Sequence, residues 1–318
     1  MTLPFQILLF LVGLTLIVVG ADLLVDGASS VARRFGISEF VIGLTIVGMG
    51  TSAPEMVVSF LGALKGNADI AVGNVIGSNI FNTLLVLGLT AVIMPIPITR
   101  DNRRRDIPVN FGVTALLALF GMVICGGNGR ELSRWEGAVL IALFIGYMVS
   151  SFKYDDGSAG GAAPEKRIRP LLAVLMIAGG LAALIGGGEL FVDSATAIAR
   201  RLGISDKFIA ITILAGGTSM PELATCVVAA AKKKGQLALG NILGSNVFNI
   251  LLILGGSALI HPLSFASMNA VDMGVLLLSA VLVFTGTFLF RRDSLDRGDG
   301  ILLLLCEAAY FTWLCICL

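Results

Sequence analysis

Charged residues are scarce in this chain of 318 residues. Asp, Glu, Lys and Arg make up 14% of it, hydrophobic residues make up 56%, and the mean hydropathy is +0.94. A soluble domain of this size needs a larger polar surface. The net charge is only +1, so no overall field favours nucleic acid as a partner. The composition excludes an ordinary soluble protein and indicates a chain embedded in a lipid bilayer.

Histidine is nearly absent, and the cysteines form no ordered pattern. The one histidine, His261, lies at the end of an apolar run, and no apolar run contains Lys, Arg or His away from its ends. An intramembrane serine hydrolase would therefore lack its base. A dyad of two carboxylic acids is the remaining enzymatic alternative, and it would leave the neighbouring hydroxyl groups without a role. The five cysteines show no metal-ligand spacing and are expected to be small apolar residues.

Apolar runs of about 20 residues recur along the whole chain, which is typical of transmembrane helices. They predict an all-α polytopic membrane protein with ten transmembrane helices. A polar, Gly- and Ala-rich stretch at 153–169 predicts a cytoplasmic linker between two five-helix repeats, 1–152 and 170–318. The predicted spans are 4–25, 38–64, 70–94, 108–126, 135–152, 170–193, 206–231, 237–260, 270–290 and 299–317.

The basic residues predict the orientation. Sixteen of the 22 fall in loops on one side of the ten-span arrangement, and six fall on the other. Cytoplasmic loops carry the excess of Lys and Arg. We therefore expect a multi-pass protein of a bacterial-type inner membrane with both termini on the outer side.

An internal repeat occupies most of each half. Residues 21–82 align with residues 188–249 at a constant offset of 167, and about 28 of the 62 pairs are identical. Many of the matched residues are polar, which shared membrane composition cannot explain. Five spans is an odd number, so the second repeat would enter the membrane from the opposite side. Inverted repeats of this kind are typical of secondary transporters, whose site lies at the midplane between the halves, and they favour a transporter over a channel.

The residues that carry chemistry lie in two matched motifs. Glu55 and Glu222 lie mid-span with no basic partner there, so they require a cation. Pro54 and Pro221 break the helix beside each Glu, and unwound backbone can offer carbonyl ligands where it lines a cavity. Hydroxyl and amide groups complete an all-oxygen site for a hard cation. They are Thr51, Ser52, Thr218, Ser219, Ser78, Ser245, Asn82 and Asn249.

Two further sets of matched residues are open to more than one interpretation. Asp22 and Asp26 are echoed by Glu189 and Asp193, near the predicted helix ends. A solvated acidic face is the favoured interpretation, and an ion entrance is the alternative. The glycines of the second motif are spaced four apart and predict close helix packing; they are Gly73, Gly77, Gly240 and Gly244.

The motifs GTSAPE (50–55) with GSNIFN (77–82), and GTSMPE (217–222) with GSNVFN (244–249), resemble the calcium/cation antiporter superfamily, near its prokaryotic sodium/calcium exchangers. The resemblance covers the full ten-span length. It implies alternating access, with Ca²⁺ and Na⁺ as transported ions and no cofactor. It also adds the backbone carbonyls of Gly48 and Ala215 to the expected ligands. Some family members carry Asp where this chain has Asn82 or Asn249, which argues against potassium dependence.

The expected function is sodium/calcium antiport across the inner membrane. The alternatives are a proton-coupled calcium exchanger and an antiporter of another divalent cation. Transported cations and membrane lipid are the expected partners, with no nucleic acid or protein partner and with function as a monomer.

Overall fold

The computed structural model describes residues 2–124, 131–155, 168–203, 215–265, 268–288 and 293–317. Within these ranges the chain is almost wholly helical, and seven helices are long and apolar enough to cross a membrane. An eighth candidate is the pair Glu39–Thr51 and Ala53–Leu64, which is bent by 49°. The prediction of an all-α, multi-pass membrane protein is therefore confirmed. Cys125 and most of the predicted linker lie outside the described residues.

The first half begins with the long helix α1 (Leu3–Phe35), which ends at Gly36 in the left-handed conformation (φ 65°). A helix with a break (residues 39–64) and a helix with a π-helical bulge (residues 68–93) follow. Two more helices come next, and a short strand precedes each of them. The elements are α2 (Glu39–Ile42), η1 (Gly43–Val47), α3 (Gly48–Thr51), α4 (Ala53–Leu64), α5 (Ala68–Phe81), η2 (Asn82–Val86), α6 (Leu87–Ile93), β1 (Ile96–Pro97), η3 (Asn102–Asp106), α7 (Ile107–Leu119), η4 (Phe120–Ile124), β2 (Glu131–Leu132) and α8 (Arg134–Lys153), where η marks π-helical segments.

The second half repeats this order. Its described elements are α9 (Pro170–Arg201), α11 (Ala215–Gly217), α12 (Met220–Ala231), α13 (Gly235–Val247), η6 (Phe248–Leu254), α14 (Gly255–Ile260), β3 (Leu263–Ser264), α15 (Ala270–Phe288), β4 (Ser294–Leu295) and α16 (Arg297–Cys317). Helix α12 begins and ends 167 residues after α4, and β3 lies 167 residues after β1. The repeat seen in the sequence is thus also a repeat of structure.

The short strands connect the two halves in a crossed manner. Strand β1 pairs with β4, and β2 pairs with β3, both antiparallel. The first strand of each half therefore pairs with the second strand of the other half. This reciprocal exchange is what a two-fold relation between the halves requires.

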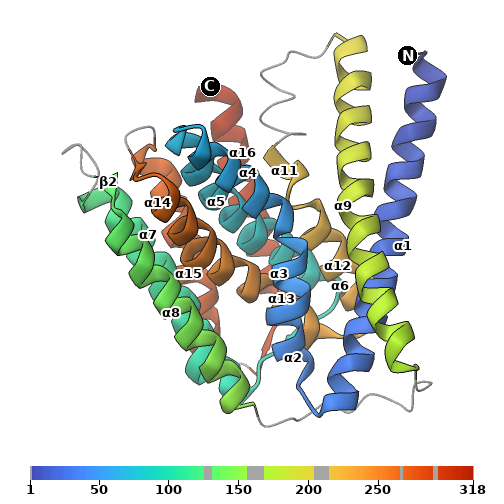
Figure 1. Ribbon diagram of the computed structural model, residues 1–318, viewed down its shortest axis with the longest axis horizontal. Helices are drawn as coiled ribbons and strands as arrows, with labels where there is room; N and C mark the ends of the chain where they lie inside the picture. Colours follow the sequence, from blue (N-terminus) through green and yellow to red (C-terminus); the bar gives the residue numbers. More distant parts are fainter. Residues whose placement is uncertain are drawn as a thin grey trace.

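Helices α1 and α9 lie side by side and run in opposite directions (Figure 1). Glycines allow their backbones to approach closely: a Cβ on Gly20 would lie 2.8 Å from the Gly180 carbonyl oxygen, and one on Gly187 would lie 3.0 Å from that of Gly13. Such close contact between small residues is how helices associate in lipid. The pair packs as one two-helix unit at the edge of the molecule.

The predicted spans 4–25 and 170–193 are too short, because α1 extends to Phe35 and α9 to Arg201. The arginine pairs Arg33–Arg34 and Arg200–Arg201 therefore belong to the last turns of helices, where positive charge is favoured by the helix dipole. For the same reason Asp22 and Asp26 lie well inside α1 rather than near its end. These arginines lie within the two helices but beyond the apolar segments that were predicted as spans.

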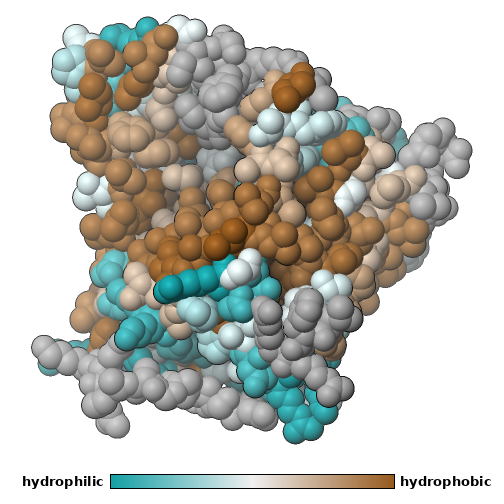
Figure 2. All heavy atoms as spheres, turned by 180° about the vertical axis from the view of Figure 1, so that it is seen from behind, coloured by the Kyte–Doolittle hydropathy of each residue, from teal (hydrophilic) through white to brown (hydrophobic). Residues whose placement is uncertain are grey.

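The surface is divided by polarity. Figure 2 shows a broad hydrophobic region across the middle of the molecule and hydrophilic residues gathered mainly toward the lower end. The interior is organised around α13, in which every residue except Gln236 is buried. Helix α13 crosses η1 and α2, so its centre lies against the broken helix of the first half. The two matched motifs are thereby brought into contact.

Candidate ion-binding site

The break in the helix over residues 39–64 places Glu55 in the first turn of α4. Ser52 lies at the break with non-helical ψ (10°), and Pro54 occupies the first turn, where its missing N–H costs no helical hydrogen bond. The second half repeats this arrangement, with Ser219 just before α12 and with Pro221 and Glu222 in its first turn. The positive end of each helix dipole therefore points at its own carboxylate. The predicted helix breaks are confirmed.

The two carboxylates are linked across the halves. Neither Glu55 nor Glu222 has any exposed surface. The Ser52 hydroxyl donates to Glu222 Oε1 (2.8 Å), and the Ser219 hydroxyl donates to Glu55 Oε1 (3.1 Å). Each serine thus binds the carboxylate of the other motif instead of capping its own helix. This reciprocal contact brings the two motifs into one site.

One oxygen of each carboxylate remains available. Glu55 Oε2 and Glu222 Oε2 are buried and have no hydrogen-bond partner among the described residues. Buried anionic oxygens without a partner are costly unless a cation or proton satisfies them. Within the described ranges no cluster of three or more His, Cys, Asp and Glu exists, so the site has two carboxylates as its charged groups. Oxygen ligands of this kind suit Ca²⁺ and Na⁺.

Hydroxyl and carbonyl groups surround the carboxylates. The Ser245 hydroxyl donates to the Gly48 carbonyl (3.3 Å), which joins α13 to α3. The Thr51 hydroxyl lies 3.3 Å from the same carbonyl and 3.2 Å from Asn241 Oδ1. Ser78 is also buried. Thr218 lines a cleft described below, and Ala215 is the first residue of α11.

The matched asparagines have different surroundings. Asn249 Nδ2 donates to Asn79 Oδ1 (3.1 Å), and Asn246 Nδ2 donates to the Thr83 hydroxyl (2.8 Å). Both amide atoms of Asn82 are buried without a hydrogen-bond partner in the described part of the chain. Asn249 is therefore tied to the opposite half through its Nδ2, but its Oδ1 is buried without a hydrogen-bond partner in the described part of the chain, so both asparagines have an amide oxygen available to a cation.

Asn74 and Asn241 were not among the candidate residues. Asn74 Nδ2 donates to the Glu55 carbonyl (3.1 Å) and to the Ser59 hydroxyl (2.9 Å), which fixes the first turns of α4 against α5. Asn241 Nδ2 lies 3.1 Å from Cys226 Sγ in the second half. The two asparagines occupy equivalent positions in the two repeats. Their identity in the alignment is the sequence feature that could have marked them as part of the site.

A cleft of about 500 Å³ leads toward the site between α4 and α9. Its inner end is formed by Pro54, Thr218 and Pro221, each close in sequence to a buried Glu. The α9 side carries Glu189 and Asp193. This α4–α9 cleft is lined mostly by apolar residues, carries two acidic side chains, and reaches the prolines that precede Glu55 and Glu222.

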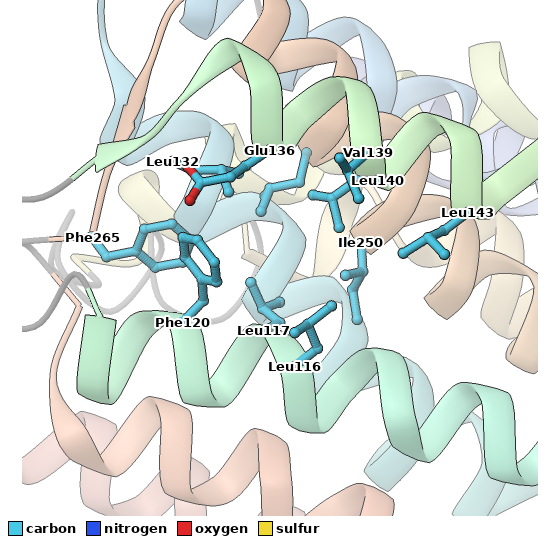
Figure 3. A pocket seen from close by; sticks show the side chains of 11 residues that line it. Leu116, Leu117, Phe120, Leu132, Glu136, Val139, Leu140, Leu143, Ile250 and Phe265 are labelled. Carbon is cyan, nitrogen blue, oxygen red and sulfur yellow. The ribbon is translucent and has the colours of Figure 1, made fainter.

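A second cavity, of about 170 Å³, has a different character. Figure 3 shows Leu117, Phe120 and Phe265 pointing into it between α7 and α8. Its acidic residue, Glu136, is held in the capping box of α8, where Ser133 N–H donates to Glu136 Oε2 (2.8 Å). This cavity offers no set of oxygen ligands and is not a candidate for the ion site.

The family model for the sodium/calcium exchanger protein matches residues 5–153 and 172–316. The chain belongs to the sodium/calcium exchanger family. It is 36% identical to the inner membrane protein YrbG of Escherichia coli over 96% of this chain and 94% of that protein. It is 31% identical to the sodium/calcium exchanger MaX1 of Methanosarcina acetivorans over 95% and 96% of the two chains. A solved structure of the sodium-calcium exchanger NCX_Mj matches with a TM-score of 0.84 and 33% identity over 98% of this chain and 99% of that chain.

As a member of this family the chain is a multi-pass membrane antiporter that exchanges sodium for calcium, and it is not an enzyme. The expected family is confirmed. Sodium and calcium are the transported ions, and the family works without a cofactor.

Replacing Ser52 by Ala is expected to weaken calcium binding about tenfold, because the hydroxyl both orients Glu222 and adds an oxygen to the site. Equilibrium binding of calcium-45 to the purified protein would measure the change. Ser279→Ala is the matched control, since this buried serine donates to the Leu276 carbonyl of its own helix and has no other partner within the described ranges. Equal affinity in the two variants would contradict a role for Ser52.

Proposed function

We propose that sodium and calcium exchange through one site formed by the two crossed motifs. The observation that carries this proposal is the reciprocal pair of hydrogen bonds, Ser52 to Glu222 and Ser219 to Glu55. The ligands are the two glutamates with Thr51, Thr218, Ser52, Ser219, Ser78, Ser245, Asn82, Asn249 and the carbonyls of Gly48 and Ala215. This set is supported by the buried oxygens that have no hydrogen-bond partner among the described residues, in Glu55, Glu222, Asn82 and Asn249.

The proposed architecture is ten transmembrane helices in two inverted five-helix repeats, 1–152 and 170–318. The opposite directions of α1 and α9 support inversion, and so do the crossed strand pairs. Helices α8 and α16 each close a half, and α1 begins at the same end of the molecule at which α16 ends (Figure 1). An even number of spans requires this placement of the termini.

The proposed mechanism follows from charge balance. Two carboxylates carry the charge that one Ca²⁺ neutralises, and Na⁺ ions bound in its place neutralise the same charge. An empty site would leave two buried anions while the protein moves between its two open states, and that is costly. The loaded protein therefore changes state more readily than the empty one, which couples the two ions obligatorily.

The proposed location is the inner membrane, with both termini on the outer side and the chain functional as a monomer. The excess of basic residues in the loops at the opposite end supports this orientation. The relative YrbG is described as an inner membrane protein. In this orientation the α4–α9 cleft opens outward, since it is lined by the first half of α4 and the second half of α9, and both helices run from there toward the end of the molecule at which α1 begins (Figure 1).

The test is calcium-45 uptake into proteoliposomes loaded with sodium. An outward sodium gradient is expected to drive calcium uptake, and uptake should stop when sodium is equal on both sides. Uptake that follows a proton gradient and ignores sodium would replace sodium by protons as the coupling ion. No calcium uptake under either gradient would contradict the proposed transport through this site.

A further inference from the structure

Helices α1 and α9 carry acidic pairs at equivalent positions, but the structure places the pairs in different surroundings. Asp22 and Asp26 correspond to Glu189 and Asp193 at the offset of 167. Lys232, the first residue after α12, corresponds to Lys65, the first residue after α4. Each half therefore contains two acidic residues and one lysine at matched positions, so their pairing can be compared between the halves.

One set is joined. Lys232 Nζ lies 2.7 Å from Asp22 Oδ1 and 2.7 Å from Asp26 Oδ1, and Lys234 Nζ lies 3.5 Å from Asp26 Oδ1. Burial opposes the charge of Lys232, but the two aspartates outweigh it and the pKa of Lys232 lies above its usual value. Helix α1 packs along α12. These contacts, called here the α12 ion pairs, hold the two helices together on one side of the site.

The other set is apart. Glu189 and Asp193 line the α4–α9 cleft, and Lys65 is exposed at the end of α4. None of these three side chains forms an ion pair within the described ranges. Helix α1 packs directly against α12. The equivalent pair of helices, α9 and α4, is separated by the cleft of about 500 Å³.

We infer that the two sets of ion pairs form alternately, and that Lys65 binds Glu189 and Asp193 when the α4–α9 cleft closes. This inference rests on the proposed function, since it assigns a set of ion pairs to each open state. Helices α1 and α9 pack as one unit through their glycines. Movement of that unit would separate Asp22 and Asp26 from Lys232 while it carries Glu189 and Asp193 to Lys65.

The exchange of partners also directs cations. Acidic residues in an open cleft raise the local concentration of cations, whereas the same residues paired with lysine do not. The open side therefore presents two unpaired carboxylates, Glu189 and Asp193, and the closed side presents Asp22 and Asp26 neutralised by lysine. Lys234 has no basic counterpart, because the equivalent residue is Asn67. The state with the α4–α9 cleft open should therefore be favoured at rest.

The experiment measures the reaction of single cysteines with a membrane-impermeant maleimide. Val57→Cys reports the α4–α9 cleft, which Val57 lines, and Ala224→Cys reports the equivalent position on the other side. The native cysteines are first replaced by serine; for Cys226 this restores the residue found at the equivalent Ser59. Each reporter is combined with Lys65→Gln or Lys232→Gln in purified protein.

Lys232→Gln is expected to slow labelling at Val57→Cys and to speed it at Ala224→Cys, each by about two- to fivefold, as for loss of a partly exposed ion pair. Lys65→Gln is expected to change both rates in the opposite direction. Lys232→Arg and Lys65→Arg keep the charge and should restore the original rates. Lys233→Gln is the matched control, since Lys233 lies beside Lys232 and makes no ion pair within the described chain.

Shifts in the same direction for the two Gln variants, or shifts no larger than that of Lys233→Gln, would overturn the inference. Labelling needs no ion gradient and no knowledge of the transported ion. A failed uptake experiment with opposite labelling shifts would therefore reject the proposed ion exchange alone. Normal uptake with equal labelling would reject the alternating ion pairs alone.

Discussion

Glu222→Gln and Glu55→Gln are each expected to abolish sodium-driven calcium uptake while the protein stays folded. Each glutamate is fully buried, and each has an oxygen without a partner among the described residues. At contact distance the attraction between unit charges is on the order of 4 kcal/mol at an effective dielectric of about 20. Loss of one carboxylate should therefore weaken calcium binding by roughly a hundredfold or more.

Folding should survive because glutamine has the same shape and removes a buried charge. The Gln carbonyl can still accept the hydrogen bond from the opposite serine. Calcium-45 binding to purified protein and uptake into sodium-loaded proteoliposomes measure the effect, and thermal unfolding checks the fold. Glu131→Gln is the matched control, because Glu131 is exposed in strand β2 and away from the two motifs. Uptake at the original rate in either site variant would remove that glutamate from the transport site.

Gly240→Ala is expected to lower the stability of the protein and to reduce uptake strongly. A Cβ at Gly240 would overlap the Phe40 carbonyl oxygen and lie 2.9 Å from the Leu44 amide nitrogen. Both contacts are backbone atoms, so no side chain can rotate away. Overpacking of this kind costs about 1–3 kcal/mol, and separating α13 from η1 would also displace Ser245 from Gly48.

The melting temperature of the purified protein and the rate of calcium-45 uptake measure this change. Gly146→Ala in α8 is the matched control, since Gly146 is exposed and a Cβ there has nothing within 4 Å. Gly146→Ala should leave the melting temperature unchanged or raise it slightly, because alanine favours a helix over glycine. Equal melting temperatures for the two variants would contradict the close crossing of α13 and η1.

The predicted packing role of the second-motif glycines is confirmed for Gly240 and Gly244. A Cβ on Gly244 would lie 2.5 Å from the Leu44 carbonyl oxygen. Among the described residues, a Cβ on Gly73 would have its nearest neighbour at 3.8 Å, the Met268 side chain, and a Cβ on Gly77 would have none within 4 Å, so close packing is not found at these two glycines. The glycines of the second motif therefore pack closely against backbone in the second half and not in the described surroundings of the first half. An alignment of the repeats does not reveal this difference.

Much of the fold followed from local properties of the sequence. Apolar runs, helix breaks beside Pro54 and Pro221, and an offset of 167 are readable because each depends on neighbouring residues or on direct comparison of two segments. The family followed from the same motifs and is confirmed. The full set of ion ligands stays a prediction, although the buried and unpartnered oxygens of Glu55 and Glu222 support its centre.

The ends of the helices were harder to predict from the sequence. Helices α1 and α9 continue about ten and eight residues beyond the predicted spans to Phe35 and Arg201, because a helix can continue past the apolar limit of a span when its last turns carry arginine. Hydropathy alone marks the apolar segment and not the helix.

The sequence by itself determined the class of protein, the duplicated motifs and the two carboxylates that need a cation, since these depend on composition, on repetition and on charge in apolar runs. Only the tertiary structure decided that Ser52 binds Glu222 and Ser219 binds Glu55, and that Asp22 and Asp26 are paired with lysine while Glu189 and Asp193 line a cleft. The matched residues Asp22, Asp26, Lys232 and Glu189, Asp193, Lys65 do not reveal that difference when the two repeats are aligned. It arises because the α1–α9 unit packs against α12 on one side of the site and leaves α4 open on the other.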